Sequence, residues 1–287
     1  MSLAKIVYNK RSSKKYGWSP SWLGMTGFNE DLISAIARFQ DEHGLEPDGM
    51  VGPITHRRLE ANREAHHQPR TSGILCHGKY VPLDWRSLKT DYLKPGTHKE
   101  VKRERSPTMI VTHWDAALSA ASCKKILEKR NISTHFVIDN DGTILQLLDC
   151  NHIAWHAGNR RVNNASIGID FSNAYYTKYN DTYEKRGFGK RPVLEDSVVH
   201  GITLKPHLGY YPIQIEAYKK LISTLCSYYD IELNYPMNED GSLLTGVHQP
   251  AVRGRFNGVT CHYHLTRKKI DTAGLPLDDI INELKNS

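Results

Sequence analysis

The stretch Gly258-Val-Thr-Cys-His262-Tyr-His264-Leu-Thr-Arg-Lys-Lys269-Ile-Asp271-Thr-Ala-Gly274 brings two imidazoles, an ammonium and a carboxylate together in a short, turn-prone segment. A second stretch, Met109-Ile-Val-Thr-His113-Trp114, is an apolar run of strand type that ends in a histidine. Two neutral imidazoles and one carboxylate, with a fourth position left to water, form a common catalytic zinc arrangement. In a strand or extended loop, Lys269 would lie on the same side as Asp271, because side chains alternate with a period of two. The two stretches therefore predict a metal site with a fixed cation beside it.

Strands and helices alternate along the chain from about residue 74 onward. Apolar runs predict strands at 108–111 and 166–171, and a hairpin whose turn is Asp139-Asn-Asp-Gly142. Helical spacing of apolar residues predicts helices over 116–130 and 213–229. This order predicts a mixed α/β domain, 74–287, with one central β-sheet flanked by helices.

Two further segments of this domain are less regular. An extra strand is expected within 74–85, before the main sheet. Residues 175–210 are long, basic and rich in tyrosine, which suggests a lid or a loop that contacts a substrate.

The first 66 residues carry a different signature, and a polar, aperiodic linker follows at His66–Gly73. Apolar residues at helical spacing in 31–40, a turn at Pro47-Asp48-Gly49 and a second helix after it predict a small three-helix domain. The ordered pattern Ala-x-x-x-Phe-Gln, Gly-Leu, Asp-Gly-x-x-Gly-Pro-x-Thr resembles the peptidoglycan-binding module that is attached to cell-wall hydrolases. That resemblance implies wall binding through Phe39, Gln40, Asp48 and Gly49.

The composition and charge of the chain argue against several classes of protein. Five scattered cysteines without a Cys-x-x-Cys pair argue against a disulfide framework and against a cysteine-based zinc module. No apolar run approaches the roughly 18 residues that a membrane span needs, and no signal peptide is evident. The formal charge of +7 suggests a polyanionic partner, but the positive charge is diffuse. We therefore expect an anionic envelope polymer of bacteria, and no nucleic acid, as the partner.

Five motifs follow one another in the order of a known enzyme family. They are Thr-His-Trp at 112–114, Ser-Thr-His-Phe-Val-Ile-Asp-Asn-Asp-Gly-Thr at 133–143, Trp-His-Ala-Gly at 155–158, Asn-x-Ser-Ile-Gly-Ile-Asp at 164–170 and His-Tyr-His-x-x-x-x-Lys-Ile-Asp at 262–271. With them, nearly all of residues 108–274 resembles the zinc-dependent N-acetylmuramoyl-L-alanine amidases of the phage-lysozyme and peptidoglycan-recognition-protein superfamily.

The resemblance implies roles for individual residues. His113, His262 and Asp271 would be the zinc ligands, and His264 is the alternative to His262. Lys269 matches the catalytic lysine that stabilises the oxyanion. Asp170 stands where several members carry a glutamate, and it would act as the base. The remaining residues expected to line the substrate groove are Trp114, His135, Trp155, His156, Asn164 and His264.

Besides Asp170, the sequence departs from the family at two places. The family's usual Pro-Gly after the last ligand is Thr272-Ala-Gly274 here. Thr134 stands where phage relatives often carry a catalytic tyrosine, so that function is absent or replaced.

The resemblance also implies an activity and a setting. The enzyme would hydrolyse the amide bond between N-acetylmuramic acid and L-alanine of the peptidoglycan stem peptide, with zinc lowering the pKa of a bound water toward ~7. A wall-binding module joined to an amidase, without an export signal, is typical of a phage endolysin. Such an enzyme would accumulate as a monomer in the host cytoplasm, reach the wall after a holin opens the membrane, and lyse the host.

Two other hypotheses about the function are compatible with the sequence. A bacterial cytoplasmic amidase that recycles muropeptides would need no wall-binding module. A non-catalytic peptidoglycan-recognition protein would lack a metal ligand, whereas all three are present here. Metal analysis separates an enzyme from a recognition protein.

Overall fold

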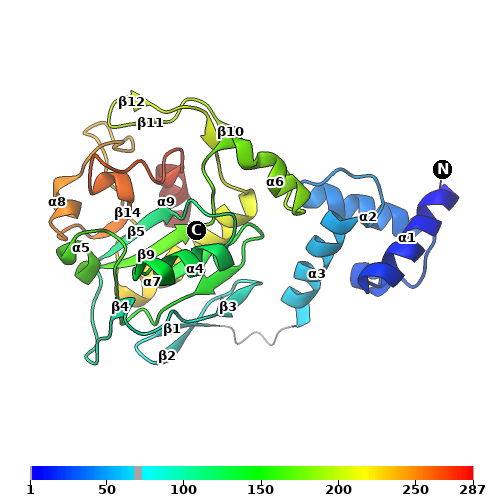
Figure 1. The fold of residues 1–287 in the computed structure, drawn as a ribbon, viewed down its shortest axis with the longest axis horizontal. Coiled ribbons are helices and arrows are strands. Elements are labelled where there is room, and N and C mark those ends of the chain that lie inside the picture. The colour runs from blue at the N-terminus through cyan, green and yellow to red at the C-terminus, as the bar shows by residue number, and fades with distance from the viewer. Residues whose placement is uncertain (1, 68–72, 287) are drawn as a thin grey trace. The chain divides into compact units, whose positions relative to one another are not determined.

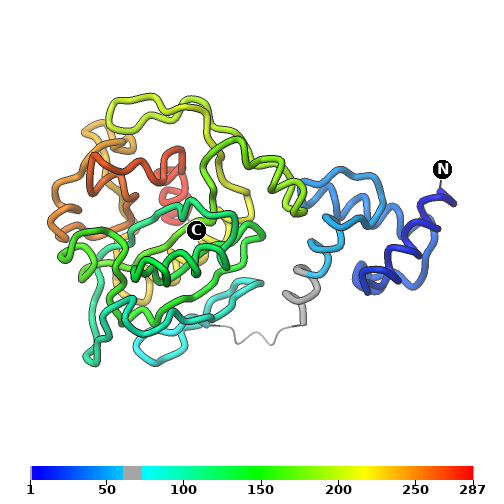
Figure 2. Tube along the Cα trace, viewed as in Figure 1, coloured from blue at the N-terminus to red at the C-terminus, as the bar shows by residue number. Residues whose placement is uncertain are grey.

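The computed structural model describes residues 2–67 and 73–286, which form two compact units (Figures 1 and 2). The helical unit consists of the residues before the predicted linker together with Asn180–Lys190, and the sheet unit contains the rest of the chain. Most of the predicted linker, His66–Gly73, lies outside the described residues. The grouping of Asn180–Lys190 with the helical unit was not anticipated from the sequence.

The described residues before the linker form three α-helices, which confirms the predicted three-helix domain. They are α1 (Ser2–Tyr16), α2 (Glu30–Glu42) and α3 (Pro53–His67), and a short 3₁₀ helix, η1 (Pro20–Leu23), follows α1. The side chain of Asn29 caps α2 by accepting from the backbone N–H of Leu32. The core of the unit is formed by Trp18, Leu32, Ile36, Phe39, Val51 and Leu59.

The four residues expected to bind the cell wall do not form an exposed surface. Phe39 is in the core, and Gln40 is 2% exposed. The Gln40 amide nitrogen donates to Asp48 Oδ1 at 2.8 Å, and its oxygen accepts from the Gly49 N–H at 2.8 Å. At Gly49, with φ of 71°, a Cβ atom would come within 2.6 Å of Ile33. Gln40, Asp48 and Gly49 shape the turn between α2 and α3. The burial of Phe39, Gln40 and Gly49 corrects the assignment of these three as contacts to the wall, whereas Asp48 is half-buried.

The sheet unit is built on a six-stranded mixed sheet with the order β14-β5-β9-β6-β7-β3. Strands β14 (Gly258–Cys261), β5 (Met109–Trp114), β9 (Ser166–Phe171) and β6 (Phe136–Ile138) are mutually parallel. Strand β7 (Ile144–Gln146) runs antiparallel to β6 in the predicted hairpin, and β3 (Leu88–Thr90) is parallel to β7. The predicted fold class, a mixed central sheet flanked by helices, is confirmed.

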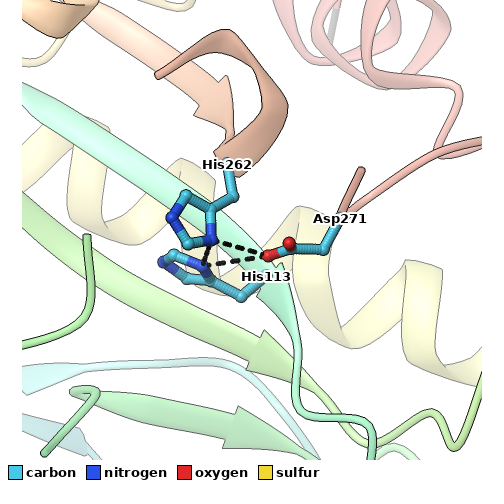
Figure 3. A group of neighbouring side chains, drawn as sticks. All are labelled: His113, His262 and Asp271. Atoms are coloured by element: carbon cyan, nitrogen blue, oxygen red, sulfur yellow. Dashed lines mark hydrogen bonds and ion pairs between the residues drawn. The ribbon is translucent and has the colours of Figure 1, made fainter. Parts of the chain in front are cut away.

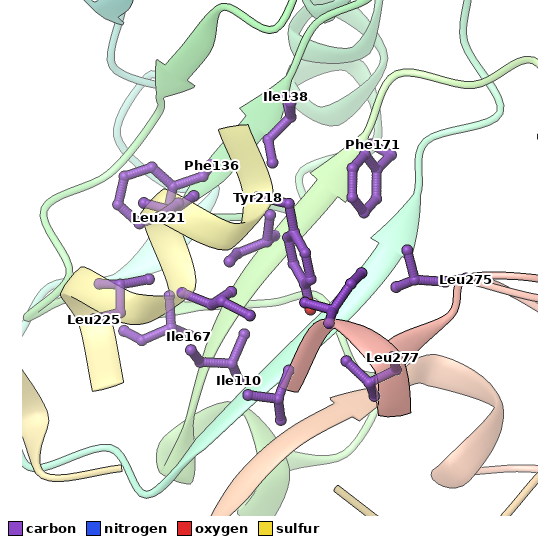
Figure 4. Close-up of a cluster of buried hydrophobic side chains, with 14 of the residues drawn as sticks. Ile110, Phe136, Ile138, Ile167, Phe171, Tyr218, Leu221, Leu225, Leu275 and Leu277 are labelled. Atoms are coloured by element: carbon purple, nitrogen blue, oxygen red, sulfur yellow. The ribbon is translucent and has the colours of Figure 1, made fainter. Parts of the chain in front are cut away.

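Helices cover both faces of this sheet. On one face, α7 (Pro212–Tyr229) and α9 (Leu277–Lys285) pack on alternate strand residues such as Ile110, Ile167 and Phe136 (Figure 4). On the other face, α4 (Ala120–Arg130) packs on β6, and α5 (Arg160–Ala165) and α8 (Gln249–Val252) pack near Met109 and Val111. The alternation of Ile110 with Met109 and Val111 follows from the period of two in a strand. Because both faces are buried, the central strands are apolar throughout.

Outside the main sheet, the structure differs from two expectations. Residues 74–85 contain a hairpin, β1 (Gly73–Cys76) and β2 (Lys79–Pro82), where one strand was predicted. A second small pair joins β4 (His98–Lys99) to β8 (Ile153–Ala154). Residues 175–210 do not form one loop. They contain η2 (Thr177–Tyr179), α6 (Asn180–Lys185) and strands β10 (Val193–Leu194), β11 (Val198–Val199), β12 (Ile202–Thr203) and β13 (His207–Leu208).

Among the described residues, no helix is both long enough and apolar enough to cross a membrane.

Candidate active site

Three neighbouring parallel strands carry polar side chains to one edge of the sheet. His113 is the fifth residue of β5 and pairs in register with Asp170 of β9. Cys261, the last residue of β14, pairs with Thr112 of β5, so His262 follows directly beside His113. Carboxyl ends of parallel strands meet at the same edge, where open α/β sheets bind their ligands. The strand register therefore brings together residues that lie about 150 positions apart in the sequence.

Asp271 completes a compact group with the two histidines (Figure 3). His262 Nδ1 lies 2.9 Å from His113 Nδ1 and 2.8 Å from Asp271 Oδ2. His113 Nδ1 lies 3.2 Å from the same carboxylate oxygen. All three residues are buried, with exposures of 5% to 6%. Asp271 lies in the loop after η3 (His262–His264), and its carbonyl accepts from the Tyr263 N–H at 3.0 Å.

A chain of hydrogen bonds behind His113 fixes which of its nitrogens carries the proton. The Ser166 hydroxyl lies 2.7 Å from the Val162 carbonyl, to which it can only donate. Ser166 Oγ therefore accepts from His156 Nε2, 3.0 Å away, and neutral His156 keeps a lone pair on Nδ1. That lone pair accepts from His113 Nε2 at 2.9 Å. His113 consequently presents an unprotonated Nδ1 to the group.

Gly168 makes room for this arrangement. A Cβ atom at Gly168 would come within 2.9 Å of His156 Cγ. The glycine in Ser-Ile-Gly-Ile therefore has a packing role, because it allows the His156 ring to lie against β9.

This donor set fits a zinc ion. His113 Nδ1, which carries a lone pair, lies 3.2 Å from Oδ2 of the ionised Asp271 carboxylate. Both of these atoms are hydrogen-bond acceptors. A single Nδ1 proton on His262 cannot satisfy both of them in a buried site, whereas a cation can. Ligands at tetrahedral zinc are about 3.3 Å apart. The observed separations of 2.8 Å to 3.2 Å are slightly shorter than that.

Electrostatics favours the deprotonated, metal-binding forms of His113 and Asp271. Burial, together with the neighbouring His262, lowers the pKa of His113 to about 4. Burial also lowers the pKa of His156 well below its usual range, which keeps that ring neutral. For Asp271, burial alone would raise the pKa. The two neighbouring imidazoles, His262 and His113, outweigh burial and hold the pKa of Asp271 well below the usual range.

Asp170 and Lys269 open into the same cavity, which has a volume of about 240 Å³. Asp170 is 7% exposed, and burial raises its pKa well above the usual range, with Asp115 and Asp271 adding to the effect. Lys269 is exposed and lies in a loop, as the sequence allowed. Its carbonyl lies 3.0 Å from the His200 Nε2 atom at the turn between β11 and β12. One carboxyl group and one ammonium group therefore border the ligand cluster.

A second cavity adjoins the first, a third adjoins the second, and both are lined by predicted groove residues. A cavity of about 550 Å³ shares His156, His262 and Lys269 with the first cavity and is also lined by Trp155. Trp155 also lines a third cavity of about 660 Å³, which Asn164 lines as well. Trp114 lines the first cavity.

His135 and His264 do not reach this groove. Each is fully buried. His264 Nδ1 accepts from the Cys261 N–H at 2.9 Å, and Nε2 donates to the Leu244 carbonyl at 2.7 Å. His135 Nδ1 accepts from the Gly168 N–H at 3.0 Å, and Nε2 donates to the His152 carbonyl at 3.0 Å. Neither ring has a nitrogen left for a substrate or a metal, so the structure corrects their assignment to the groove.

Several residues that line the first cavity were not predicted from the sequence. The last turns of α4 contribute Ile126 and Arg130 to the wall, and Asp115 and Ser133 complete it. The helical spacing of apolar residues predicts α4, but it does not predict which of its side chains reach a cavity. Ser166 lies in a recognised motif, yet only the fold shows its bond to His156.

Comparisons with known proteins agree with this geometry. The N-acetylmuramoyl-L-alanine amidase family Amidase_2 matches residues 103–271, more than half of the chain, and a peptidoglycan-binding domain family matches residues 14–59. No curated protein matches the chain. Nineteen chains of solved structures match it.

Three of these structures illustrate how distant the similarity is. N-acetylmuramoyl-L-alanine amidase LysC from Clostridium intestinale is 16% identical, covers 69% of this chain and 97% of its own, and gives a TM-score of 0.42. A mutant endolysin from Bacillus subtilis is 18% identical, with coverages of 69% and 98% and a TM-score of 0.40. The hydrolase AmiA from Staphylococcus aureus is 13% identical, with coverages of 69% and 82% and a TM-score of 0.42. By its family match, the chain belongs to the N-acetylmuramoyl-L-alanine amidases and is a peptidoglycan amidase with an N-terminal peptidoglycan-binding domain.

Proposed function

We propose that this amidase is a zinc-dependent endolysin, with His113, His262 and Asp271 as the metal ligands. The observation that carries the zinc assignment is a buried pair of hydrogen-bond acceptors, His113 Nδ1 and Asp271 Oδ2, which lie only 3.2 Å apart. His262 supplies a third possible ligand atom beside them. The bond cleaved would be the amide between the lactyl group of N-acetylmuramic acid and L-alanine.

The side chains around the ligand cluster have distinct tasks in this reaction. A bound zinc ion would supply Lewis acidity, which activates water and polarises the substrate carbonyl. Lys269 lies where its ammonium can stabilise the negative charge that develops on the carbonyl oxygen. His156 and Ser166 hold the His113 ring and its tautomer.

Asp170 would move the proton. The carboxylate accepts a proton from the attacking water and delivers it to the departing nitrogen of L-alanine, so that the amide C–N bond breaks and the amine leaves neutral. A carboxyl group whose pKa is raised by burial is suited to holding that proton between the two steps. This matches the base role expected from the sequence.

The endolysin assignment rests on the combination of domains. The domain division 1–66 and 74–287 is part of the proposal, with the first domain holding the enzyme on the polymer and so raising its local concentration. A muropeptide-recycling amidase acts on soluble fragments and gains nothing from such a domain. The enzyme would be made as a monomer in the host cytoplasm and reach the wall after a holin opens the membrane.

Lysis from within separates the two kinds of amidase. The full chain is produced in the cytoplasm of a bacterium, and turbidity is followed before and after the membrane is permeabilised. We expect stable cells before permeabilisation, rapid clearing after it, and no clearing with Lys269→Ala. Cells that stay intact after permeabilisation, while their extract cleaves soluble muropeptides, would show a recycling amidase instead. Metal analysis of the purified protein should find one zinc per chain.

A further inference from the structure

Positive charge in the helical unit is concentrated on α1. This helix carries Lys5, Lys10, Arg11, Lys14 and Lys15 and no acidic residue. Between residues 17 and 60 the balance is reversed, with seven acidic residues against three arginines. The peptidoglycan-binding match begins at residue 14, so nearly all of α1 lies outside it. The helix is therefore a feature of this chain rather than of the matched family range.

The inner face of α1 is polar and fixes how the helix is oriented. Asn9 Nδ2 donates to the Gly49 carbonyl at 3.0 Å, and Asn9 Oδ1 accepts from the Val51 N–H at 2.8 Å. Ser12 donates to the Val51 carbonyl and accepts from Trp18 Nε1. Both side chains are buried, with exposures of 0% and 5%. With this face held by the turn after α2, the opposite face of α1 is turned to solvent.

The outer face combines apolar and cationic side chains in one stripe. Leu3 is 72% exposed and Val7 is 41% exposed, and they lie one turn apart. Lys10, Arg11 and Lys14 continue the same stripe and are exposed. Tyr8, 41% exposed, lies at its edge. We call the stripe formed by Leu3, Val7, Lys10, Arg11 and Lys14 the outer face of α1.

We propose that the outer face of α1 is a binding surface for anionic lipid bilayers. Exposed leucine and valine gain free energy from leaving water only against an apolar partner, which the acyl chains of a bilayer supply. The cations beside them match the negative potential of an anionic leaflet, where each adjacent Lys or Arg strengthens binding about five-fold. The helix has 15 residues, so it would lie on the surface without spanning the bilayer. This surface is independent of the amidase assignment.

Vesicle flotation with the full chain tests the proposal. The probes are vesicles of phosphatidylcholine alone and of phosphatidylcholine with phosphatidylglycerol, at low and at physiological salt. We expect binding to the anionic vesicles only. Lys10→Gln/Arg11→Gln/Lys14→Gln should weaken that binding by roughly 100-fold, because three contributions of about five-fold are removed. Leu3→Gln/Val7→Gln should weaken it by roughly ten-fold or more, because two apolar side chains stay in water.

Matched controls remove the same kinds of group from the sheet unit. Lys220→Gln removes an exposed cation and Tyr80→Ser an exposed apolar side chain, and neither should alter flotation. Glutamine keeps a good helix propensity, and circular dichroism verifies that α1 survives. No flotation of the wild-type chain with anionic vesicles would overturn the proposal. So would binding that depends on the three cations but not on Leu3 and Val7, because the surface would then bind polyanions such as wall polymers.

Discussion

Replacing His156 should weaken zinc binding without unfolding the sheet unit. In the native chain, His156 accepts from His113 Nε2 and thereby keeps the Nδ1 lone pair of His113 directed at the ligand cluster. In His156→Ala, the His113 N–H loses its partner in a buried site, and the ring is free to rotate or to take the other tautomer. Loss of such an outer partner typically costs 10–100-fold in metal affinity. We therefore expect zinc affinity to fall by roughly that factor, about 1.4 to 2.7 kcal/mol.

The assay is competition for zinc between the protein and a chromophoric chelator, with unfolding followed in parallel. His156→Gln should recover part of the affinity, because its amide oxygen can accept from His113 and its amide nitrogen can donate to Ser166. His264→Gln is the matched control. It alters a buried histidine close to His262 whose ring nitrogens bond only to the backbone, so it should lower stability more than zinc affinity.

Unchanged zinc affinity in a folded His156→Ala protein would refute the reasoning, since the hydrogen-bond chain from Val162 to His113 would then have no influence on the metal site. An equal loss in His156→Gln and His156→Ala would also refute it, because the tautomer argument predicts a difference between a side chain that can accept and one that cannot.

Three other outcomes follow from the same geometry. Lys269→Ala should retain zinc and lose turnover by roughly 10²–10³-fold, as measured on purified peptidoglycan, and near-native rates would exclude an oxyanion role. Gln40→Ala should destabilise the helical unit by about 1 to 3 kcal/mol in denaturant unfolding, because Gly49 N–H and other buried partners lose their bonds, while cleavage of soluble muropeptides stays unchanged. Burial lowers the folded-state pKa of His264 to about 3, so the unfolded chain binds the extra proton below pH ~6.5. From pH 7 to pH 5, the free energy of unfolding of the wild type should therefore fall by about 2 kcal/mol more than that of His264→Gln. Equal pH dependence of the two proteins would contradict this prediction.

The sequence was most informative where local pattern and strand order act together. Apolar runs followed by histidine or aspartate predicted β5 and β9, and the parallel register then placed His113 opposite Asp170. The Asp139-Asn-Asp-Gly142 turn predicted the hairpin of β6 and β7 correctly. These features depend on residues close together in the chain, for which periodicity and turn chemistry are reliable guides.

Burial of polar side chains could not be anticipated in the same way. The sequence put Gln40 at the end of a helix and Asp48 in a turn, and the resemblance implied that both bind the wall. In the structure they bond to each other, a contact that local pattern could not predict. His135 and His264 lie within recognised motifs, but the fold turns both rings inward to backbone partners. Whether a polar group faces a groove or the interior depends on which strand packs beside it, and that is a long-range property.

The most direct test is the chemistry of the products that the zinc-loaded chain releases from purified sacculi, identified by mass spectrometry. We expect stem peptides with a free N-terminal L-alanine and glycan strands with no new reducing ends. These products should be absent for the zinc-free protein and should return when zinc is added. New reducing sugar ends or cleavage within the peptides would contradict the amidase activity. Equal release without zinc would contradict its dependence on a metal held by His113, His262 and Asp271.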